Sequence, residues 1–303
     1  KVLRMIYFLY SFLWRLVRLL PEKVASGLFT LIAKVAYRRN SKRVRRLREN
    51  YQTILLSGKT SATTSDVETL VRKGLRNSMR YWCETFRISD WSVEFARSRA
   101  AIVGLEHLQD AFDSRSGVIV AVPHAGNWDH AGAYFCQIGI PLTTVAEKLE
   151  PEKIFLKFLD YRQQIGMEIL SHKEKTIPTL TERLKQGKLV ALVADRDLSK
   201  SGVEVKFFGK TAKMPAGPAL LWLETNCKFI TAFVSYTETG VHVQFDEIAP
   251  EKLANARAQA EKEEGIKIIT QAMAENFERR ISQSPVDWHM LQRIWIEPVN
   301  KPI

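Results

Sequence analysis

The chain has little of what stabilises small secreted proteins or binds structural metals. Its 303 residues include only three cysteines, Cys83, Cys136 and Cys227, whose spacing matches neither a disulfide framework nor a metal-ligand motif. Isolated thiols of this kind are typical of buried cysteines in a reducing compartment. We therefore expect no disulfide and no metal centre.

The N-terminal region lacks a hydrophobic run long enough to cross a bilayer. Ten uncharged residues lie between Arg4 and Arg15, whereas a spanning helix needs roughly 20. There is no secretory cleavage pattern, and because residue 1 is a lysine the true start of the protein is left open. Pro/Gly-rich linkers, repeats and low-complexity tracts are also missing, which favours a helical segment over residues 1–50 and one compact catalytic domain over residues 51–303.

Several catalytic signatures are absent as well. Gly209-Lys210-Thr211 resembles the end of a phosphate-binding loop, but Glu204 occupies the position of the first glycine. The chain has neither the Gly-x-Ser-x-Gly of serine hydrolases nor the His-Glu-x-x-His of zinc peptidases. A covalent serine intermediate is therefore not indicated, and direct transfer between two substrates is favoured.

What the chain does have is a large apolar fraction and an uneven charge. Hydrophobic residues make up 46% and charged residues 26% of the sequence, as in a folded globular protein. Residues 1–50 contain thirteen Lys and Arg against Glu22 and Glu49, and so hold eleven of the twelve net positive charges. The body of the protein is nearly neutral.

These first 50 residues predict two amphipathic helices. The polar stripe of the first consists of Lys1, Arg4, Ser11, Arg15 and Arg18. The apolar residues around it are Leu3, Ile6, Phe8, Leu9, Phe12, Leu13, Leu16 and Leu20. Pro21 ends this helix, a second apolar stretch runs from Val24 to Tyr37, and seven cations follow within residues 38–48.

A wide apolar face beside a cationic cluster is typical of helices that lie in the membrane interface, where anionic headgroups attract Lys and Arg. The alternative is an ordinary amphipathic helix docked on the domain with a solvated basic face. Nucleic acid is not expected as a partner, because the apolar helix would then have no role.

Apolar and amphipathic segments alternate from about residue 100 onward. The expected strands are Val118–Val122, Leu142–Ala146, Leu189–Ala194, Phe229–Val234, Val241–Phe245 and Arg293–Glu297, the fifth antiparallel to the fourth. The expected helices are residues 61–90, Trp128–Gln137, Ile154–Ile165, Ile177–Gln186, Ala216–Thr225 and a long helix over Ala254–Ile281. This alternation predicts an α/β fold, with a central, mostly parallel mixed sheet flanked by helices on both faces.

The most informative segment follows the first of these strands. His124 and, five residues later, Asp129 lie where the strand ends and a helix begins, and strand ends in α/β folds meet the substrate crevice. An imidazole oriented by a carboxylate accepts a proton from a hydroxyl near neutral pH. We expect His124 to be a general base and Asp129 to hold its tautomer, while Gly126 and the helix N-terminus offer N–H groups to an anion.

Two other interpretations of this segment stay open. In the first, His124 is a structural histidine at a strand end and Asp129 favours the helix dipole. In the second, His124, Asp129 and His130 bind a metal, although no further ligand stands at a recognised spacing.

A second polar block, Asp195-Arg196-Asp197, directly follows the strand expected over Leu189–Ala194. Glu204 lies in an alternating segment after it and is expected to reach back toward His124, a position for which Asp195 and Asp197 compete. Lys213 precedes an apolar helix whose start suits a phosphate, although a hairpin followed by a Pro-initiated helix is the simpler interpretation.

Several blocks together resemble an acyltransferase family. His124 to Asp129 is similar to the His-x4-Asp motif of glycerolipid and lysophospholipid acyltransferases, in the branch that includes the bacterial lipid A late acyltransferases. The similarity continues through Glu147, Arg162, the Asp195 block, Phe207-Phe208-Gly209 and Asp287-Trp288-His289, over most of residues 100–297. The blocks that most resemble actinobacterial phosphatidylinositol mannoside acyltransferases are Pro123-His124-x-Gly126-Asn127-Trp128-Asp129, Asp195-Arg196-Asp197-Leu198-Ser199, Gly202-Val203-Glu204-Val205-x-Phe207-Phe208-Gly209 and Met214-Pro215-Ala216-Gly217-Pro218-Ala219.

The resemblance implies transfer of a fatty acyl group, palmitoyl, from acyl-CoA as co-substrate to a mannose hydroxyl of a phosphatidylinositol mannoside, with no other cofactor. It implies His124 as base, Asp129 as its partner and Glu204 as a further catalytic carboxylate. The expected substrate-binding residues are Gly126, Asn127, Glu147, Arg162, Asp195, Arg196 and Asp197. The protein is expected to bind peripherally to the anionic cytoplasmic face of the plasma membrane, and Ala216–Thr225 is a candidate wall of an apolar acyl channel.

Two alternatives to this function stay open. One keeps the chemistry but changes the acceptor to a lysophospholipid or a lipid A precursor. The other is a non-catalytic membrane- or nucleic-acid-binding protein in which His124 is structural. The sequence also leaves open whether CoA or an acidic carrier protein delivers the acyl group.

Overall fold

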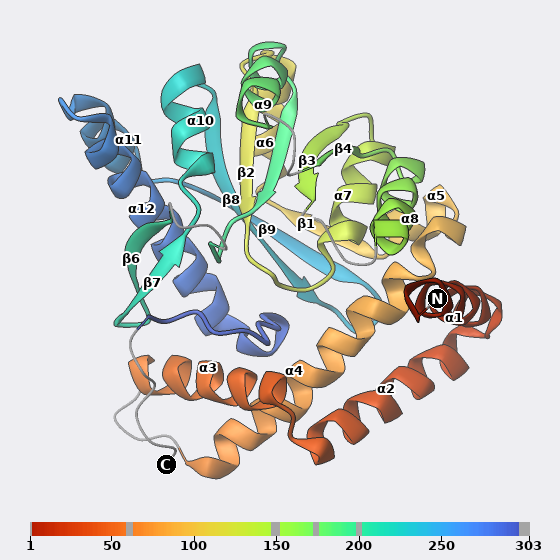
Figure 1. Cartoon of the computed structure of the whole chain (residues 1–303). Coiled ribbons are helices and arrows are strands. Elements are labelled where there is room, and N and C mark those ends of the chain that lie inside the picture. Colours follow the sequence, from red (N-terminus) through yellow and green to blue (C-terminus); the bar gives the residue numbers. More distant parts are fainter. Residues whose placement is uncertain (1, 59–62, 147–151, 172–175, 198–201, 297–303) are drawn as a thin grey trace.

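The computed structural model describes residues 2–58, 63–146, 152–171, 176–197 and 202–296 (Figure 1). The strands are β1 (Ala100–Val103), β2 (Val118–Val122), β3 (Leu142–Ala146), β4 (Glu168–Ser171), β5 (Leu189–Val193), β6 (Val203–Phe207), β7 (Lys210–Met214), β8 (Lys228–Tyr236) and β9 (Val241–Glu247). The helices are α1 (Val2–Leu19), α2 (Glu22–Arg39), α3 (Lys42–Gly58), α4 (Thr64–Thr85), α5 (Val93–Ser98), α6 (Leu105–Asp113), α7 (Trp128–Gln137), α8 (Glu152–Gln164), α9 (Thr176–Lys185), α10 (Gly217–Thr225), α11 (Pro250–Ala258) and α12 (Lys262–Gln283), with 3-10 turns at Ile88–Asp90 and Pro285–Asp287.

Seven strands form one mixed sheet in the order β1-β9-β8-β2-β5-β3-β4, and β6 and β7 form a separate hairpin beside α12 (Figure 1). Strands β8, β2, β5, β3 and β4 are mutually parallel. Strand β9 runs antiparallel to β8, and β1 pairs in parallel with β9. The expected mostly parallel mixed sheet is confirmed.

Helices cover both faces of this sheet because its central strand is apolar on both sides. In β2 the side chains of Val118, Val120 and Val122 enter one core, and those of Ile119 and Ala121 enter the other. Helices α6, α7 and α8 contribute to the first core, whereas α9, α10 and α12 contribute to the second.

The register of β2 and β5 positions the polar residues that follow them. Val122 pairs with Val193, and the N–H of Ala194 donates to the carbonyl of Val122 over 2.9 Å. Since side chains alternate along a strand, His124 and Asp195, each two residues beyond the paired valines, emerge side by side on the α7 face of the sheet.

The N-terminal helices continue into the main core. In α3, Leu47 and Tyr51 are fully buried, and the side chain of Asn50 donates to the carbonyls of Met290 (2.8 Å) and Gln292 (3.0 Å). Residue 50 thus lies inside a helix, and the division of the chain at that point stays a prediction.

Among the described residues, no helix combines the length and the apolarity needed to span a bilayer.

Two expected elements are wrong. The helix expected over Ala254–Ile281 is divided into α11 and α12 by an extended Gln259, and a Cβ at Gly265 would stand 2.7 Å from the carbonyl oxygen of Ala256, so the two helices pack closely. The segment expected as a last strand has, up to residue 296, a single bridge between Trp295 and Ala212, and the Trp295 indole donates to the carbonyl of Phe207 over 2.8 Å. Packing of one large side chain on the hairpin replaces a strand there.

Candidate active site

His124 and Asp195 form a hydrogen-bonded couple at the carboxyl ends of β2 and β5. The imidazole Nδ1 lies 2.5 Å from one oxygen of Asp195, and the backbone N–H of His124 donates to the other over 2.9 Å. Asp195 is completely buried, whereas about a third of the His124 side chain is exposed. Asp195 thus lies fixed in the interior, whereas His124 lies where substrates can reach it.

The tautomer of His124 follows from the ionisation of Asp195. Burial of Asp195 opposes ionisation, but the charge of His124 and the hydrogen bonds from His124 and Trp288 outweigh burial, so the pKa of Asp195 lies below its ordinary value. The Trp288 indole donates to Asp195 over 2.8 Å. An ionised carboxylate only accepts, so Nδ1 carries the proton in the neutral imidazole and Nε2 is the basic nitrogen.

Asp129 is not the partner of His124, and this expectation is wrong. Its carboxylate is buried and accepts from Arg162 Nε (2.9 Å), Arg162 Nη2 (3.4 Å) and the Tyr81 hydroxyl (3.0 Å). Asp129 is the second residue of α7, and its side chain is directed toward α8 and α4 instead of back toward the strand end. It compensates the buried guanidinium of Arg162.

The residues between His124 and Asp129 build a tight turn. Gly126 has φ +57, and a Cβ there would lie 2.4 Å from the carbonyl oxygen of Val234. Its N–H donates to the carbonyl of Asp287 over 2.9 Å, so the expected role of this N–H toward an anion is wrong. Asn127 caps α7 by accepting from the N–H of His130 (3.0 Å) and donates to Glu84 (2.8 Å). Both residues hold the loop that carries His124.

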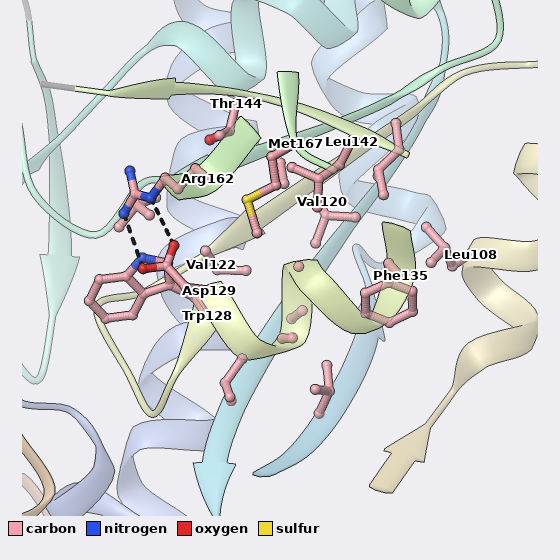
Figure 2. Close-up of a pocket in the computed structure, with 18 of the residues that line it drawn as sticks. Leu108, Val120, Val122, Trp128, Asp129, Phe135, Leu142, Thr144, Arg162 and Met167 are labelled. Atoms are coloured by element: carbon pink, nitrogen blue, oxygen red, sulfur yellow. Dashed lines mark hydrogen bonds and ion pairs between the residues drawn. The ribbon is translucent and has the colours of Figure 1, made fainter. Parts of the chain in front are cut away.

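An apolar cavity lies between α7 and the sheet (Figure 2). It contains about 710 Å³ of space not filled by atoms, part of it open to solvent. Figure 2 shows the Arg162–Asp129 ion pair and Trp128 at one end, with apolar side chains continuing past Met167 to Phe135 and Leu108. The strands contribute Val120, Val122, Leu189, Ala191, Val193, Ala232, Val234, Val243 and Phe245.

Trp128 connects this cavity to the His124–Asp195 couple. Its ring lines the cavity and meets the His124 ring edge-on, with centroids 5.6 Å apart. The helix expected as a channel wall, Ala216–Thr225, does not line the cavity: α10 packs with Leu221 and Trp222 on the opposite face of the sheet. That expectation is wrong because the helix on the cavity side is α7.

Glu204 and Asp197 have described contacts on the β6–β7 hairpin. Glu204 is exposed on β6, opposite Lys213 of β7, and within the described chain it makes no hydrogen bond to His124. The N–H of Asp197 donates to the carbonyl of Lys213 over 3.0 Å, which anchors the hairpin beside the Asp195 block. Glu147, Leu198 and Ser199 lie outside the described residues.

Three further residues of the site had no role predicted from the sequence. Trp288 and Tyr81 hold Asp195 and Asp129 respectively, and His289 donates from Nε2 to the carbonyl of Gly126 over 3.0 Å. Burial lowers the pKa of His289 to about 4, so it is neutral at physiological pH. The Asp287-Trp288-His289 block belongs to the family resemblance without a predicted role, and no local sequence pattern marks Tyr81.

Comparison with known proteins identifies the family of this chain. A sequence model of the bacterial lipid A biosynthesis acyltransferase family matches residues 1–297. A phosphatidylinositol mannoside acyltransferase of Mycolicibacterium smegmatis is 36% identical over 294 residues, which cover 96% of this chain and 91% of that protein. A protein of the same name from Mycobacterium tuberculosis (strain H37Rv) is 34% identical over 297 residues, covering 96% and 89%. This chain belongs to the bacterial lipid A biosynthesis acyltransferase family and is an acyltransferase.

Proposed function

We propose that this acyltransferase moves a palmitoyl group from acyl-CoA to a mannose hydroxyl of a phosphatidylinositol mannoside, with His124 as general base. The observation that carries the proposal is the accessible imidazole, oriented by a buried carboxylate, one ring away from an apolar cavity. The names of the mycobacterial relatives support the acceptor.

The chemistry requires one proton relay. Nε2 of His124 takes the proton of the acceptor hydroxyl as its oxygen attacks the thioester carbonyl, and Asp195 stabilises the imidazolium that forms. The C–S bond then breaks, and the imidazolium returns the proton to the leaving thiolate. Base catalysis of this kind contributes roughly 10²–10⁴-fold in rate.

The cavity supports a long acyl donor. Each buried CH₂ group contributes about 0.8 kcal/mol, so an acyl chain gains affinity with every methylene that it places between α7 and the sheet. Arg162, at the polar end of the cavity, stays a proposed substrate-binding residue, as do Arg196 and Asp197. Asp195 takes the orienting role in place of Asp129, and no described contact supports a catalytic role for Glu204.

Peripheral binding to the cytoplasmic face of the plasma membrane is part of this proposal. Among the side chains described in α1 and α2, from residue 7 onward, eleven large apolar ones are exposed: Phe8, Leu9, Phe12, Leu13, Leu16, Leu19, Val24, Leu28, Leu31, Ile32 and Val35. Exposed cations follow them at the α2–α3 corner: Arg38, Arg39, Lys42, Arg43 and Arg45. Apolar burial combined with attraction to anionic headgroups is how interfacial helices bind.

Transfer assays with a panel of acceptors test the proposal. Purified protein is incubated with radiolabelled palmitoyl-CoA, or with palmitoyl carrier protein, and with phosphatidylinositol mannoside, a lysophospholipid or a lipid A precursor in mixed micelles. We expect label from palmitoyl-CoA to appear in the mannoside. Label in one of the other lipids alone refutes the acceptor, and transfer only from the carrier protein refutes the donor.

A further inference from the structure

Trp128 stands out in the turn that carries the catalytic histidine. From Ala121 to Ala133 every residue is buried except His124 and Trp128. Within this segment, the large indole of Trp128 is therefore the one side chain besides His124 that is partly exposed.

Neighbouring rings hold the Trp128 indole in place. It stacks on Tyr81, with centroids 4.4 Å apart and planes at 26°, and on His289 at 5.8 Å and 26°. Because the Tyr81 and His289 centroids are themselves only 5.8 Å apart, both rings lie on the same face of the indole. The indole thus has one supported face, and such aromatic pairs add stability beyond burial.

Trp128 contacts both parts of the site. Its ring plane lies at 85° to that of His124, and the side chain also lines the apolar cavity next to Arg162 and Asp129 (Figure 2). An acyl chain that occupies the cavity must pass Trp128 for its carbonyl to reach the base. Among the described residues the indole N–H has no hydrogen-bond partner, so it is available as a donor at this junction.

We propose that Trp128 is the positioning residue for the acyl donor: it holds the thioester carbonyl against the acceptor hydroxyl at His124 and excludes water from that point. This inference rests on the proposed function. If water replaces the sugar hydroxyl as nucleophile, its oxygen bonds to the acyl carbon, the C–S bond breaks, and the products are a free fatty acid and the thiol. Loss of positioning thus appears as hydrolysis in place of transfer.

The chain provides a matched control. Trp91 is also partly exposed and meets a histidine edge-on, with its ring centroid 5.0 Å from that of His130 at 78°. It does not line the cavity. Substitution of Trp91 tests the loss of a tryptophan packed on a histidine without any loss at the junction.

The experiment compares Trp128→Leu, Trp128→Phe, Trp91→Leu and the parent protein, at saturating palmitoyl-CoA, for transfer and hydrolysis. We expect Trp128→Leu to lower the kcat of transfer by roughly 10²-fold and to raise the ratio of hydrolysis to transfer. Trp128→Phe keeps a ring on Tyr81 and recovers part of the loss, and Trp91→Leu leaves the ratio unchanged. An unchanged ratio in Trp128→Leu, with the parent active, overturns this inference but not the proposed function.

A spectroscopic measurement covers the case in which Trp128→Leu does not fold. In protein labelled with 5-fluorotryptophan, the Phe variants of Trp128 and Trp91 assign two ¹⁹F resonances. We expect palmitoyl-CoA to shift the Trp128 resonance and to leave that of Trp91 in place. A shift at other tryptophans alone overturns the inference, and a parent that neither binds nor turns over palmitoyl-CoA overturns the proposed function with it.

Discussion

Two regions of the molecule differ in whether their side chains find partners within the protein. One is the strand-end network, formed by the His124–Asp195 pair and by Asp129 with its partners, and the other is the outer face of α1 and α2. In the network, the buried carboxylates Asp195 and Asp129 accept several hydrogen bonds each, from partners far away in the sequence. On the outer face, Phe12 is 63% and Leu19 82% exposed. Residues of the chain itself supply the hydrogen-bond partners of the network, whereas no part of the described structure covers the outer face of α1 and α2.

This difference predicts that the network governs the reaction and the stability, whereas the outer face governs where the protein binds. Damage to the network should change the reaction or the free energy of unfolding, because buried charges and their partners depend on each other. Damage to the outer face should change only where the protein binds, because exposed apolar side chains add little to the fold.

The largest effect is expected for His124→Ala. Because the proposed base is removed, transfer should fall by roughly 10²–10⁴-fold, and the free energy of unfolding should fall as well, since the completely buried Asp195 loses a hydrogen-bond partner. Initial rates with radiolabelled donor measure this. The control is His107→Ala, equally exposed and 3.3 Å from Glu247, which should keep full activity. Equal activity of both variants contradicts the catalytic assignment.

Asp129→Ala should mainly unfold the protein. It leaves the guanidinium of Arg162 buried without its carboxylate, and breaking such a pair costs about 3–5 kcal/mol. Denaturant titration followed by circular dichroism gives the value. Glu49→Ala removes the partly exposed partner of Arg46 and should cost about 0–1 kcal/mol. If the two variants unfold alike, Asp129 does not stabilise the fold by pairing with the buried Arg162.

Acid should destabilise the network through His289. Burial lowers its folded-state pKa to about 4, below the ordinary 6.5. As the pH falls, the unfolded state therefore binds the proton first. The contribution of the neutral His289 to the free energy of unfolding is complete above pH 6.5 and is lost as the pH falls toward 4. Its size is up to about 3 kcal/mol. Unfolding of His289→Gln at pH 7 and pH 4.5 should show a smaller acid loss than the parent; an identical loss would argue against a neutral buried His289.

The smallest effect concerns the outer face. Phe12→Ser and Leu31→Ser each remove an exposed apolar side chain, whose full burial is worth roughly 1.5–3 kcal/mol, so each should weaken binding to anionic vesicles roughly tenfold. Vesicle co-sedimentation at low and high salt measures this. Val103→Ser, at an exposed position of the edge strand β1, is the control and should bind normally. Weakened binding by the control as well would refute a localised membrane face.

Local patterns predicted the elements around the site well. Strands β2 and β3 and helix α7 have the predicted bounds, because a buried apolar run, a strand-to-helix turn and an Asn cap are all encoded within a few residues. The same patterns placed His124 and Asp195 at strand ends. They failed for Asp129, whose partners Tyr81 and Arg162 stand 48 and 33 residues away.

The sequence by itself determined the alternation of strands and helices, the basic apolar N-terminus and the polar residues at two strand ends, since each of these depends on neighbours within a few positions. Only the tertiary structure decided which acid meets His124 and where the cavity lies. Asp195 is 71 residues from His124, and the register of β2 against β5 brings them together. That register is a property of the assembled sheet, because pairing between distant strands is set by the packing of both faces and by no local signal.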